Sequence, residues 1–326
     1  MNDPMIQALR GPILVLGGGG FVGANLFLTL QRERNDVFAV VRNRPAWRLN
    51  TALPDRILEV DITDFAAVRN LIETIKPQTV FDCVAYGAYS FEEDARLIHR
   101  TNFTALVDFI EMLSKSPFAA YIHAGSSSEY GLNCAGPAED APLRPNGHYS
   151  VSKAAMAQYV HFSGVIRGLP IVNLRLYSVY GTLEDTSRLM PNLVFKAIRG
   201  QYPPFVNPEI SRDFIYITDV CSAFIQAAVR LHPGMYGASF NIGTGTATTI
   251  RELASITKKT FAISGDPEFG SMPERKWDLV NWYANPAKAR EEFGWFAKVG
   301  VAQGLELMRP WIASLSDDDF AKRTKI

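Results

Sequence analysis

The chain has 326 residues, of which 47% are hydrophobic, so it is long enough for one large domain or two ordinary ones with a sizeable core. Its 33 basic and 33 acidic residues give a net charge of zero, which argues against nucleic acid or an anionic membrane surface as a partner. The three cysteines, Cys83, Cys134 and Cys221, are far apart, and the five histidines lack the spacing of metal ligands. We therefore expect buried thiols in a cytoplasmic, reducing environment, without a disulfide framework or a metal site.

One segment has the length and composition of a membrane span. Residues 11–31 carry no charge, yet four consecutive glycines within them interrupt the helix that spanning requires. The first residues of the chain also lack the basic region of a secretory signal peptide. We expect neither a membrane segment nor a cleaved leader.

Within this segment, a strand, a glycine turn and a helix are predicted in succession. An apolar run at 13–16 predicts a buried strand, and residues 21–30 have an amphipathic helical pattern. Between them, Gly17, Gly20 and Gly23 are spaced as G-x-x-G-x-x-G. The first permits a sharp turn, the second a close approach of the backbone to a pyrophosphate, and the third close packing of helix on strand. Because the helix points free N–H groups at that pyrophosphate, the segment predicts a dinucleotide-binding turn.

Strands and helices alternate through the first half of the chain. Apolar residues at helical spacing predict helices, for example at 65–75 and 102–113. Apolar runs predict strands at 13–16, 37–41, 57–60, 79–83, 119–124 and 171–176. This alternation indicates an α/β fold, a doubly wound parallel sheet of the Rossmann type, with ligands at the carboxyl ends of its strands.

The pattern changes after about residue 178, where elements become shorter and Pro and Gly more frequent. We assign residues 1–178 to the dinucleotide-binding Rossmann domain, and expect 213–232, a strand followed by a helix, to return to it. Residues 179–212 and 233–326 are assigned to a smaller α/β lobe, where we expect the substrate.

Two further segments carry residues suited to proton transfer. Tyr149 and Lys153 open a predicted helix at 150–166 and, four residues apart, lie on one helix face. A nearby ammonium favours the phenolate, so we expect Lys153 to lower the pKa of Tyr149 and make it a general acid and base. Ser126 follows the strand at 119–124, at the sheet edge where ligands bind, and offers a hydroxyl group there.

Taken together in chain order, these motifs resemble the extended short-chain dehydrogenase/reductase superfamily, in its NAD(P)-dependent nucleotide-sugar epimerase/dehydratase/reductase branch. The resemblance covers nearly the whole chain. Besides the glycines and the Ser126, Tyr149 and Lys153 set, it rests on Asp61-Ile62, Asn102, and the segments 174–181, 212–220, 241–245, 275 and 284–288.

The resemblance implies a role for each matching residue. The implied catalytic residues are Ser126, Tyr149 and Lys153, of which Lys153 also binds the nicotinamide ribose. The implied cofactor-binding residues are Gly17, Gly20, Phe21, Val22, Gly23, Arg42, Asn43, Arg44, Asp61, Ile62, Tyr86 and Lys153. The implied substrate-binding residues are Ser126, Ser127, Ser178, Arg212 and Arg275, in which the two guanidinium groups suit a diphosphate.

Several departures from the family pattern narrow the expected reaction. Sugar dehydratases of the family carry Asp-Glu directly after the catalytic hydroxyl residue, whereas this chain has Ser127 and Ser128, so dehydration is not expected. The predicted second strand is followed by Arg42-Asn43-Arg44 instead of an acid that binds the ribose, which favours NADP(H), with NAD(H) as the alternative.

The sugar pocket also departs from the pattern. The family's His-x-Ala-Ala is replaced by residues 84–87, and its Asn in the N-V-Y-G motif by Ser178. Similar Tyr-Gly segments occur in 4-ketoreductases that resemble CDP-paratose synthase. The sequence therefore predicts NADPH-dependent reduction of a 4-keto nucleotide-activated sugar in a carbohydrate-biosynthetic role.

Two other functions stay open: an NAD-dependent nucleotide-sugar 4-epimerase, and a non-catalytic NADP-binding regulator. The resemblance further implies a homodimer, formed through the apolar helices at 102–113 and 150–166.

Overall fold

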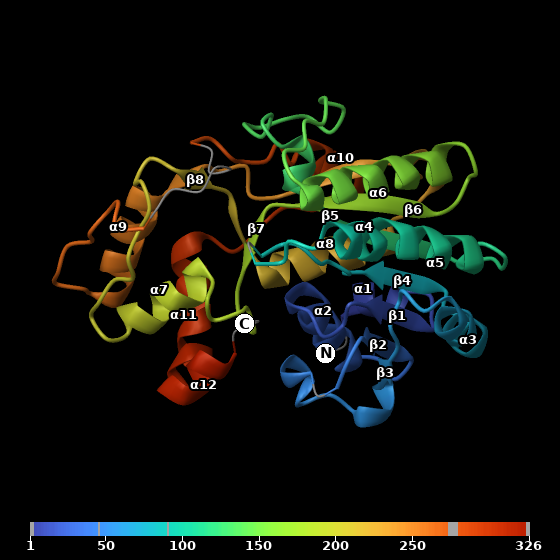
Figure 1. Cartoon of the computed structure of the whole chain (residues 1–326), viewed down its shortest axis with the longest axis horizontal. Helices are drawn as coiled ribbons and strands as arrows, with labels where there is room; N and C mark the ends of the chain where they lie inside the picture. Colours follow the sequence, from blue (N-terminus) through green and yellow to red (C-terminus); the bar gives the residue numbers. More distant parts are fainter. Residues whose placement is uncertain (1–2, 45, 90, 273–279, 324–326) are drawn as a thin grey trace.

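The computed structural model describes residues 3–44, 46–89, 91–272 and 280–323 and has two lobes, the larger on the right of Figure 1 and the smaller on the left. A seven-stranded sheet in the order β10-β6-β5-β4-β1-β2-β3 forms the larger lobe, and each neighbouring pair is parallel. Its strands are β1 (Ile13–Leu16), β2 (Val37–Val41), β3 (Ile57–Glu59), β4 (Thr79–Asp82), β5 (Ala120–Ser126), β6 (Ile171–Leu176) and β10 (Ser239–Ile242). The predicted Rossmann-type fold is confirmed.

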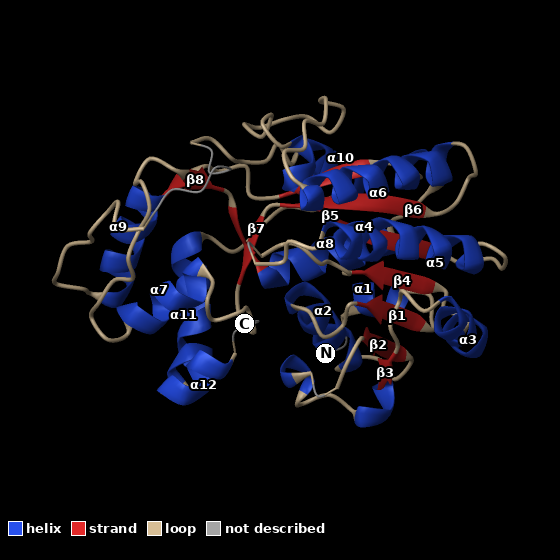
Figure 2. Cartoon of the chain, viewed as in Figure 1, coloured by secondary structure: helices blue, strands red, loops and turns tan. Residues whose placement is uncertain are grey.

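Helices cover both faces of this sheet, which explains why its strands are continuous apolar runs (Figure 2). On one face lie α1 (Pro4–Ala8), α2 (Phe21–Gln31) and α8 (Ile217–Val229), which share a buried core. On the other face lie α3 (Phe65–Ile75), α5 (Ala105–Leu113) and α6 (His148–Val165), which share a second core. The central strands are therefore buried from both sides.

The strand order reverses at β1, which pairs with β2 on one side and with β4 on the other. In such sheets the connections diverge at this point and leave a crevice beyond the carboxyl ends of the strands. The fold therefore places a ligand site after β1 and β4, where the glycine turn lies.

One strand of the sheet lies outside the range expected for it. The sequence assignment gives all of 233–326 to the smaller lobe, but β10 pairs with β6 and extends the large sheet. α10 (Ala287–Phe293) then contacts β10. The remaining lobe boundaries stay a prediction.

The helix predicted at 102–113 begins earlier than expected. α4 (Ala95–His99), a π-helical turn (Arg100–Thr104) and α5 follow one another without a break. The π turn carries Asn102, whose buried side-chain amide accepts a hydrogen bond from Tyr86 N (2.8 Å) and donates one to Tyr86 O (2.7 Å). The wider turn thus fixes the loop that follows β4, in keeping with the frequent placement of π turns at functional sites.

The smaller lobe is mainly helical. Its helices are α7 (Leu189–Ala197), α9 (Ile250–Phe261), α11 (Val301–Ala313) and α12 (Asp317–Lys322). The chain also forms two small sheets: β7 (Ser178–Tyr180) with β9 (Phe214–Tyr216), and β8 (Ser211–Arg212) with β11 (Thr248–Thr249). Within the described residues, none of the helices has both the length and the apolar character that a membrane crossing requires.

Candidate active site

The glycine turn has the geometry that the sequence predicts. Gly17 has a φ of +68°, and a Cβ there would lie 2.7 Å from Cys83 O. A Cβ on Gly23 would lie 2.3 Å from Gly17 O, so the start of α2 packs directly on the turn. Gly20 is the N-cap of α2 and has no side chain to satisfy the first N–H groups of the helix. The turn, with Phe21 and Val22 in the first turn of α2, fits a pyrophosphate.

The residues that follow β2 and β3 differ in how they are held. Arg42 and Asn43 are exposed. Arg44 is also exposed, but its guanidinium group donates to the carbonyl oxygens of Pro54 and Ile57. Of the two arginines, only Arg44 is held by the backbone of the described residues.

Asp61 and Ile62 lie just beyond β3, the edge strand of the sheet. The Asp61 carboxylate accepts hydrogen bonds from Thr63 N (2.9 Å) and Thr63 Oγ1 (2.8 Å), which closes a turn there. Ile62 is half-buried against the core on the α5 side. Both residues follow the same edge of the sheet as the glycine turn.

Lys153 joins the carboxyl ends of two central strands. Its side chain is only 1% exposed, and its Nζ donates to Val84 O (3.0 Å) and Ala124 O (2.8 Å). Burial lowers the pKa of this ammonium group, while the carboxylates of Asp82 and Glu129 oppose that effect. The lysine therefore lies at the sheet edge where the sequence analysis expects Ser126.

Tyr149, in the first turn of α6, is half-buried, and the Ser126 hydroxyl lies near enough to influence its pKa. Contrary to the expectation from Lys153, the pKa of Tyr149 is raised, because burial outweighs the opposing effect of the Ser126 hydroxyl. In this structure Lys153 directs its charge at two carbonyl groups. Tyr149 is consequently a protonated phenol at neutral pH, a state suited to giving a proton.

A buried Asp–His pair beneath Lys153 was missed by the sequence analysis. Asp82, at the end of β4, accepts hydrogen bonds from His123 Nδ1 (2.6 Å), Tyr121 OH (2.9 Å) and Val84 N (3.0 Å). Asp82 and His123 are fully buried. A charged residue ending an otherwise apolar strand was the signal available in the sequence.

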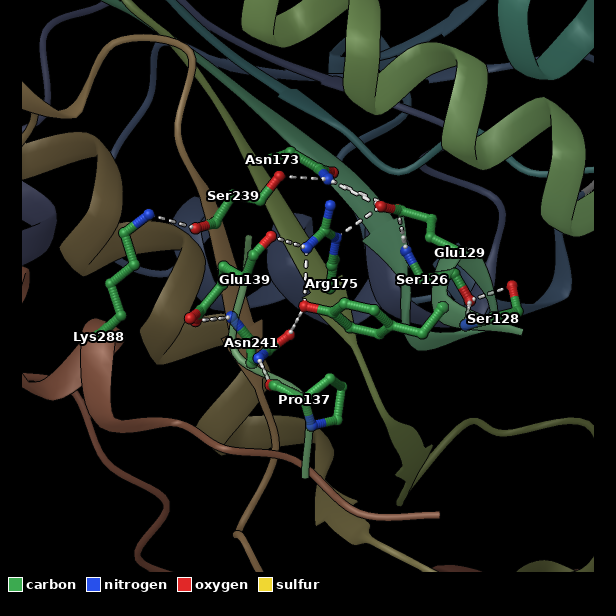
Figure 3. A network of polar contacts seen from close by, with 11 residues as sticks. Ser126, Ser128, Glu129, Pro137, Glu139, Asn173, Arg175, Ser239, Asn241 and Lys288 are labelled. Carbon is green, nitrogen blue, oxygen red and sulfur yellow. Dashed lines mark hydrogen bonds and ion pairs between the residues drawn. The ribbon is translucent and has the colours of Figure 1, made fainter. Parts of the chain in front are cut away.

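A larger polar network, also missed, holds Ser126 in place (Figure 3). Glu129 Oε1 accepts from Ser126 N (2.8 Å), and Glu129 Oε2 accepts from Arg175 Nε (2.7 Å). Arg175 also donates to Tyr130 OH (2.7 Å), which donates to Asn241 Oδ1 (2.8 Å). The network thus connects the hydroxyl-bearing turn after β5 with β6 and β10, and reaches the segment that leads into α10.

The turn after β5 also contacts the smaller lobe. Trp282 Nε1 donates to Ser127 Oγ (3.0 Å), and the Arg212 guanidinium lies 4.9 Å from the centre of the Trp282 ring. Ser178, in β7, is half-buried and donates its N–H to Asp213 O (3.0 Å). Ser127 thus contacts the N–H edge of the indole ring, and Arg212 lies over its face. Arg275 lies outside the described residues.

The site has the groups for reversible transfer of a hydroxyl proton. A phenol, a hydroxyl group and an ammonium group lie beside a glycine turn suited to a dinucleotide, all at the carboxyl edge of one sheet. Ser126 itself accepts hydrogen bonds from Ser128 N (3.2 Å) and Ser128 Oγ (2.8 Å). No carboxylate occupies position 127 or 128, so the site lacks the acid pair of a dehydratase.

Known proteins resemble this chain over most of its length. UDP-glucuronate 4-epimerase 2 of Arabidopsis thaliana is 25% identical over 327 residues, which cover 92% of this chain and 75% of that protein. UDP-glucose 4-epimerase of Mycolicibacterium smegmatis is 27% identical over 304 residues, which cover 90% of this chain and 95% of that protein.

Solved structures agree with this likeness. Thermotoga maritima UDP-glucose 4-epimerase with UDP-glucose has a TM-score of 0.82 at 25% identity, covering 92% of this chain and 98% of the other. MoeE5 in complex with UDP-glucose and NAD has a TM-score of 0.79 at 27% identity, covering 93% and 99%. Residues 13–243 match the NAD dependent epimerase/dehydratase family. The chain therefore belongs to this family of NAD(P)-dependent enzymes, within the extended short-chain dehydrogenase/reductase superfamily.

Proposed function

We propose that the protein is an NAD-dependent 4-epimerase of a nucleotide-diphosphate hexose, acting in the cytoplasm. The observation that carries the proposal is the placement of Ser126, Tyr149 and Lys153 at the sheet edge beside the glycine turn. The relatives named as UDP-glucose and UDP-glucuronate 4-epimerases support this reaction over the 4-keto reduction that the sequence favours. Serines at 127 and 128 argue against dehydration.

The residues of the site suit an oxidation of the sugar C4 hydroxyl followed by reduction from the other side. Bound NAD supplies the hydride acceptor and afterwards the hydride donor. Tyr149, a protonated phenol in this structure, must lose its proton before it can take the hydroxyl proton as C4 is oxidised, and it returns that proton to the oxygen as C4 is reduced. Ser126 donates a hydrogen bond to the same oxygen. Lys153, which uses two N–H groups on backbone carbonyls, offers its third to a ribose hydroxyl.

The smaller lobe offers groups for the nucleotide diphosphate. The guanidinium of Arg212 suits a phosphate oxygen, and the same role is proposed for Arg275. Ser178 and Ser127 lie where β7 and the turn after β5 face this lobe, with Trp282 hydrogen-bonded to Ser127. We propose that this surface binds the diphosphate and the sugar.

Epimerisation is tested by incubating the protein and NAD with UDP-glucose, UDP-galactose or UDP-glucuronate and following the sugar by NMR. We expect interconversion of the C4 epimers of at least one of them, and no 4-keto-6-deoxy product by its alkaline ultraviolet absorbance. A protein that yields no C4 epimer, yet oxidises NADPH when given a 4-keto-6-deoxy nucleotide sugar, contradicts the proposal.

That second outcome corresponds to our second candidate, an NADPH-dependent 4-ketoreductase. One observation favours it: Arg42-Asn43-Arg44 follows β2, with no acid to bind the 2′-hydroxyl of NAD. A 2′-phosphate suits a free guanidinium, and Arg42 is exposed. Tyr149 and Ser126 act in this candidate only as the proton donor and the hydrogen-bond donor to the carbonyl oxygen.

Replacing both Arg42 and Arg44 with Ala distinguishes the cofactors. If NADP(H) is preferred, NADPH binding weakens far more than NADH binding, since a charge-assisted contact is worth roughly 1.5–3 kcal/mol. Arg42→Ala alone should account for most of the loss, because Arg44 is engaged by backbone carbonyls. Fluorescence titration of both cofactors measures the effect, and Arg69→Ala, an exposed change on α3, is the control. Equal weakening of the two cofactors removes the NADP preference.

We also propose a homodimer through α5 and α6. Phe162, Val165 and Ile166 leave apolar surface exposed at the end of α6, with Ile166 73% exposed. Sedimentation velocity of the purified protein tests this assembly, and a monomer at micromolar concentration contradicts it.

A further inference from the structure

Two fully buried carboxylates, Asp82 and Glu129, act electrostatically on Lys153, and only one of them is neutralised by another cation. Glu129 forms a 2.7 Å ion pair with Arg175. Asp82 has no arginine or lysine in contact among the described residues, and its contacts there are a histidine, a tyrosine and a backbone N–H. The charge of Asp82 is therefore left to balance the charge of Lys153.

Backbone groups link these two side chains closely. Val84 donates its N–H to Asp82 Oδ1 at 3.0 Å and accepts from Lys153 Nζ at 3.0 Å through its carbonyl. Lys153 also donates to Ala124 O, in the residue that follows His123 on β5. The carboxylate and the ammonium are thus joined through the backbone of Val84, at the ends of two adjacent strands, β4 and β5.

His123 adds a hydrogen bond to Asp82 without adding a charge. Burial and the nearby Lys153 lower the pKa of His123, so the ring is neutral. Its Nδ1 then carries the proton donated to Asp82, and Nε2 is left as a buried acceptor without a partner in the described part of the chain. Tyr121 donates a second hydrogen bond to the same carboxylate oxygen.

We propose that Asp82 is a positioning residue for catalysis, whose carboxylate, held by His123 and Tyr121, is the counter-charge that keeps the Lys153 ammonium protonated. A buried ammonium without an anion loses its proton, because desolvation disfavours the charged form. A neutral Lys153 has two N–H groups instead of three, and Val84 O and Ala124 O already take two, so none is left for the proposed ribose contact. This inference rests on the proposed role of Lys153, and it adds the group on which that role depends.

The ionisable groups around Asp82 and Lys153 come from several elements. Asp82 ends β4 and Cys83 follows it, Tyr121 and His123 lie on β5, Tyr149 and Lys153 on α6, and Glu129 on the turn after β5. Burial raises the pKa values of Cys83, Tyr121 and Tyr149, so these three are neutral near pH 7. Lys153 therefore faces Asp82 and Glu129 as its anions, and Glu129 is already paired.

Asp82→Asn tests the inference, since it keeps the size of the side chain and removes the charge. The pH titration of the Lys153 Nζ signal is followed by NMR of the protein labelled with 15N-lysine, with Lys153→Arg to assign the signal. We expect the midpoint to fall by at least about one pH unit, since losing a nearby anion destabilises the ammonium. The affinity for NAD, measured by fluorescence, should begin to decline at a correspondingly lower pH.

Tyr121→Phe is the matched control, because it removes a hydrogen bond to the same oxygen and leaves the carboxylate charged. It should leave the Lys153 midpoint unchanged. An Asp82→Asn protein whose Lys153 midpoint and NAD profile equal those of the wild type overturns the inference. If Asp82→Asn does not fold, the NMR titration of the wild type tests the inference alone. A Lys153 side chain that is already neutral at pH 7 overturns the inference, and one that is protonated supports it. Neither measurement needs a sugar or turnover, so a failure of the proposed epimerisation can be distinguished from a failure of this inference.

Discussion

Replacing Tyr149 with Phe is expected to lower kcat by about a hundredfold to ten-thousandfold, the usual loss for a positioned acid or base. In the proposed mechanism the phenol is the proton donor, and burial raises its pKa and keeps it protonated at neutral pH. Water has no comparable position on the substrate oxygen. The ring and its packing remain in the variant, so NAD affinity should change only a few-fold. Initial rates with saturating sugar and a fluorescence titration of NAD measure the two quantities.

Lys153→Met provides the comparison for this variant. It removes the ammonium that bridges Val84 O and Ala124 O, and with it the proposed ribose contact. We expect it to reduce both kcat and NAD affinity, whereas Tyr149→Phe reduces kcat alone. A Tyr149→Phe protein that turns over at a near wild-type rate removes this residue from the mechanism.

Most of the sheet was predictable because the residues of each strand form a recognisable apolar segment of the sequence. Parallel strands covered on both faces are continuous apolar runs, and β1, β2, β4 and β6 read as such in the sequence. β10 was missed because Ser239–Ile242 is short and includes polar residues, and only its pairing with β6 makes it a strand. That pairing joins positions 66 residues apart, which no local pattern reveals.

The candidate site was predictable for a related reason. In a parallel sheet all carboxyl ends meet at one edge, so residues that follow strands, such as Gly17 and Ser126, come together whatever the details of packing. Side chains whose partners are remote were not predictable. Arg175 meets Glu129 from 46 residues away, and Trp282 meets Ser127 from 155.

The pKa of Tyr149 marks the limit of reasoning from spacing. A lysine four residues on predicts a lowered value, but spacing does not report burial or what the ammonium actually contacts. In the fold both effects oppose the prediction, since the phenol is desolvated and Lys153 donates to two carbonyls. The sequence identifies Tyr149 and Lys153 as neighbours, but the protonation state of Tyr149 depends on tertiary structure.

The buried pair of Glu129 and Arg175 gives the largest expected effect on stability. Their side chains are 0% and 4% exposed, so replacing one leaves the other charge buried and unpaired. Breaking such a pair costs about 3–5 kcal/mol, and we expect Arg175→Met to lower the free energy of unfolding by that amount. Arg251→Met is the control, because its pair with Glu209 is 59% and 62% exposed and is worth at most about 1 kcal/mol. Urea unfolding followed by circular dichroism measures both.

The double variant Glu129→Leu/Arg175→Met separates the charge from the packing. With both charges removed, much of the lost stability should return, since well-packed apolar residues replace buried ion pairs at little cost. Its kcat should nevertheless stay low, because Glu129 no longer accepts the hydrogen bond from Ser126 N that fixes the catalytic turn. If Arg175→Met loses no more stability than Arg251→Met, the network of Figure 3 is not what holds the turn after β5 against β6. A double variant that regains stability and full activity together shows that Ser126 needs no anchor from Glu129.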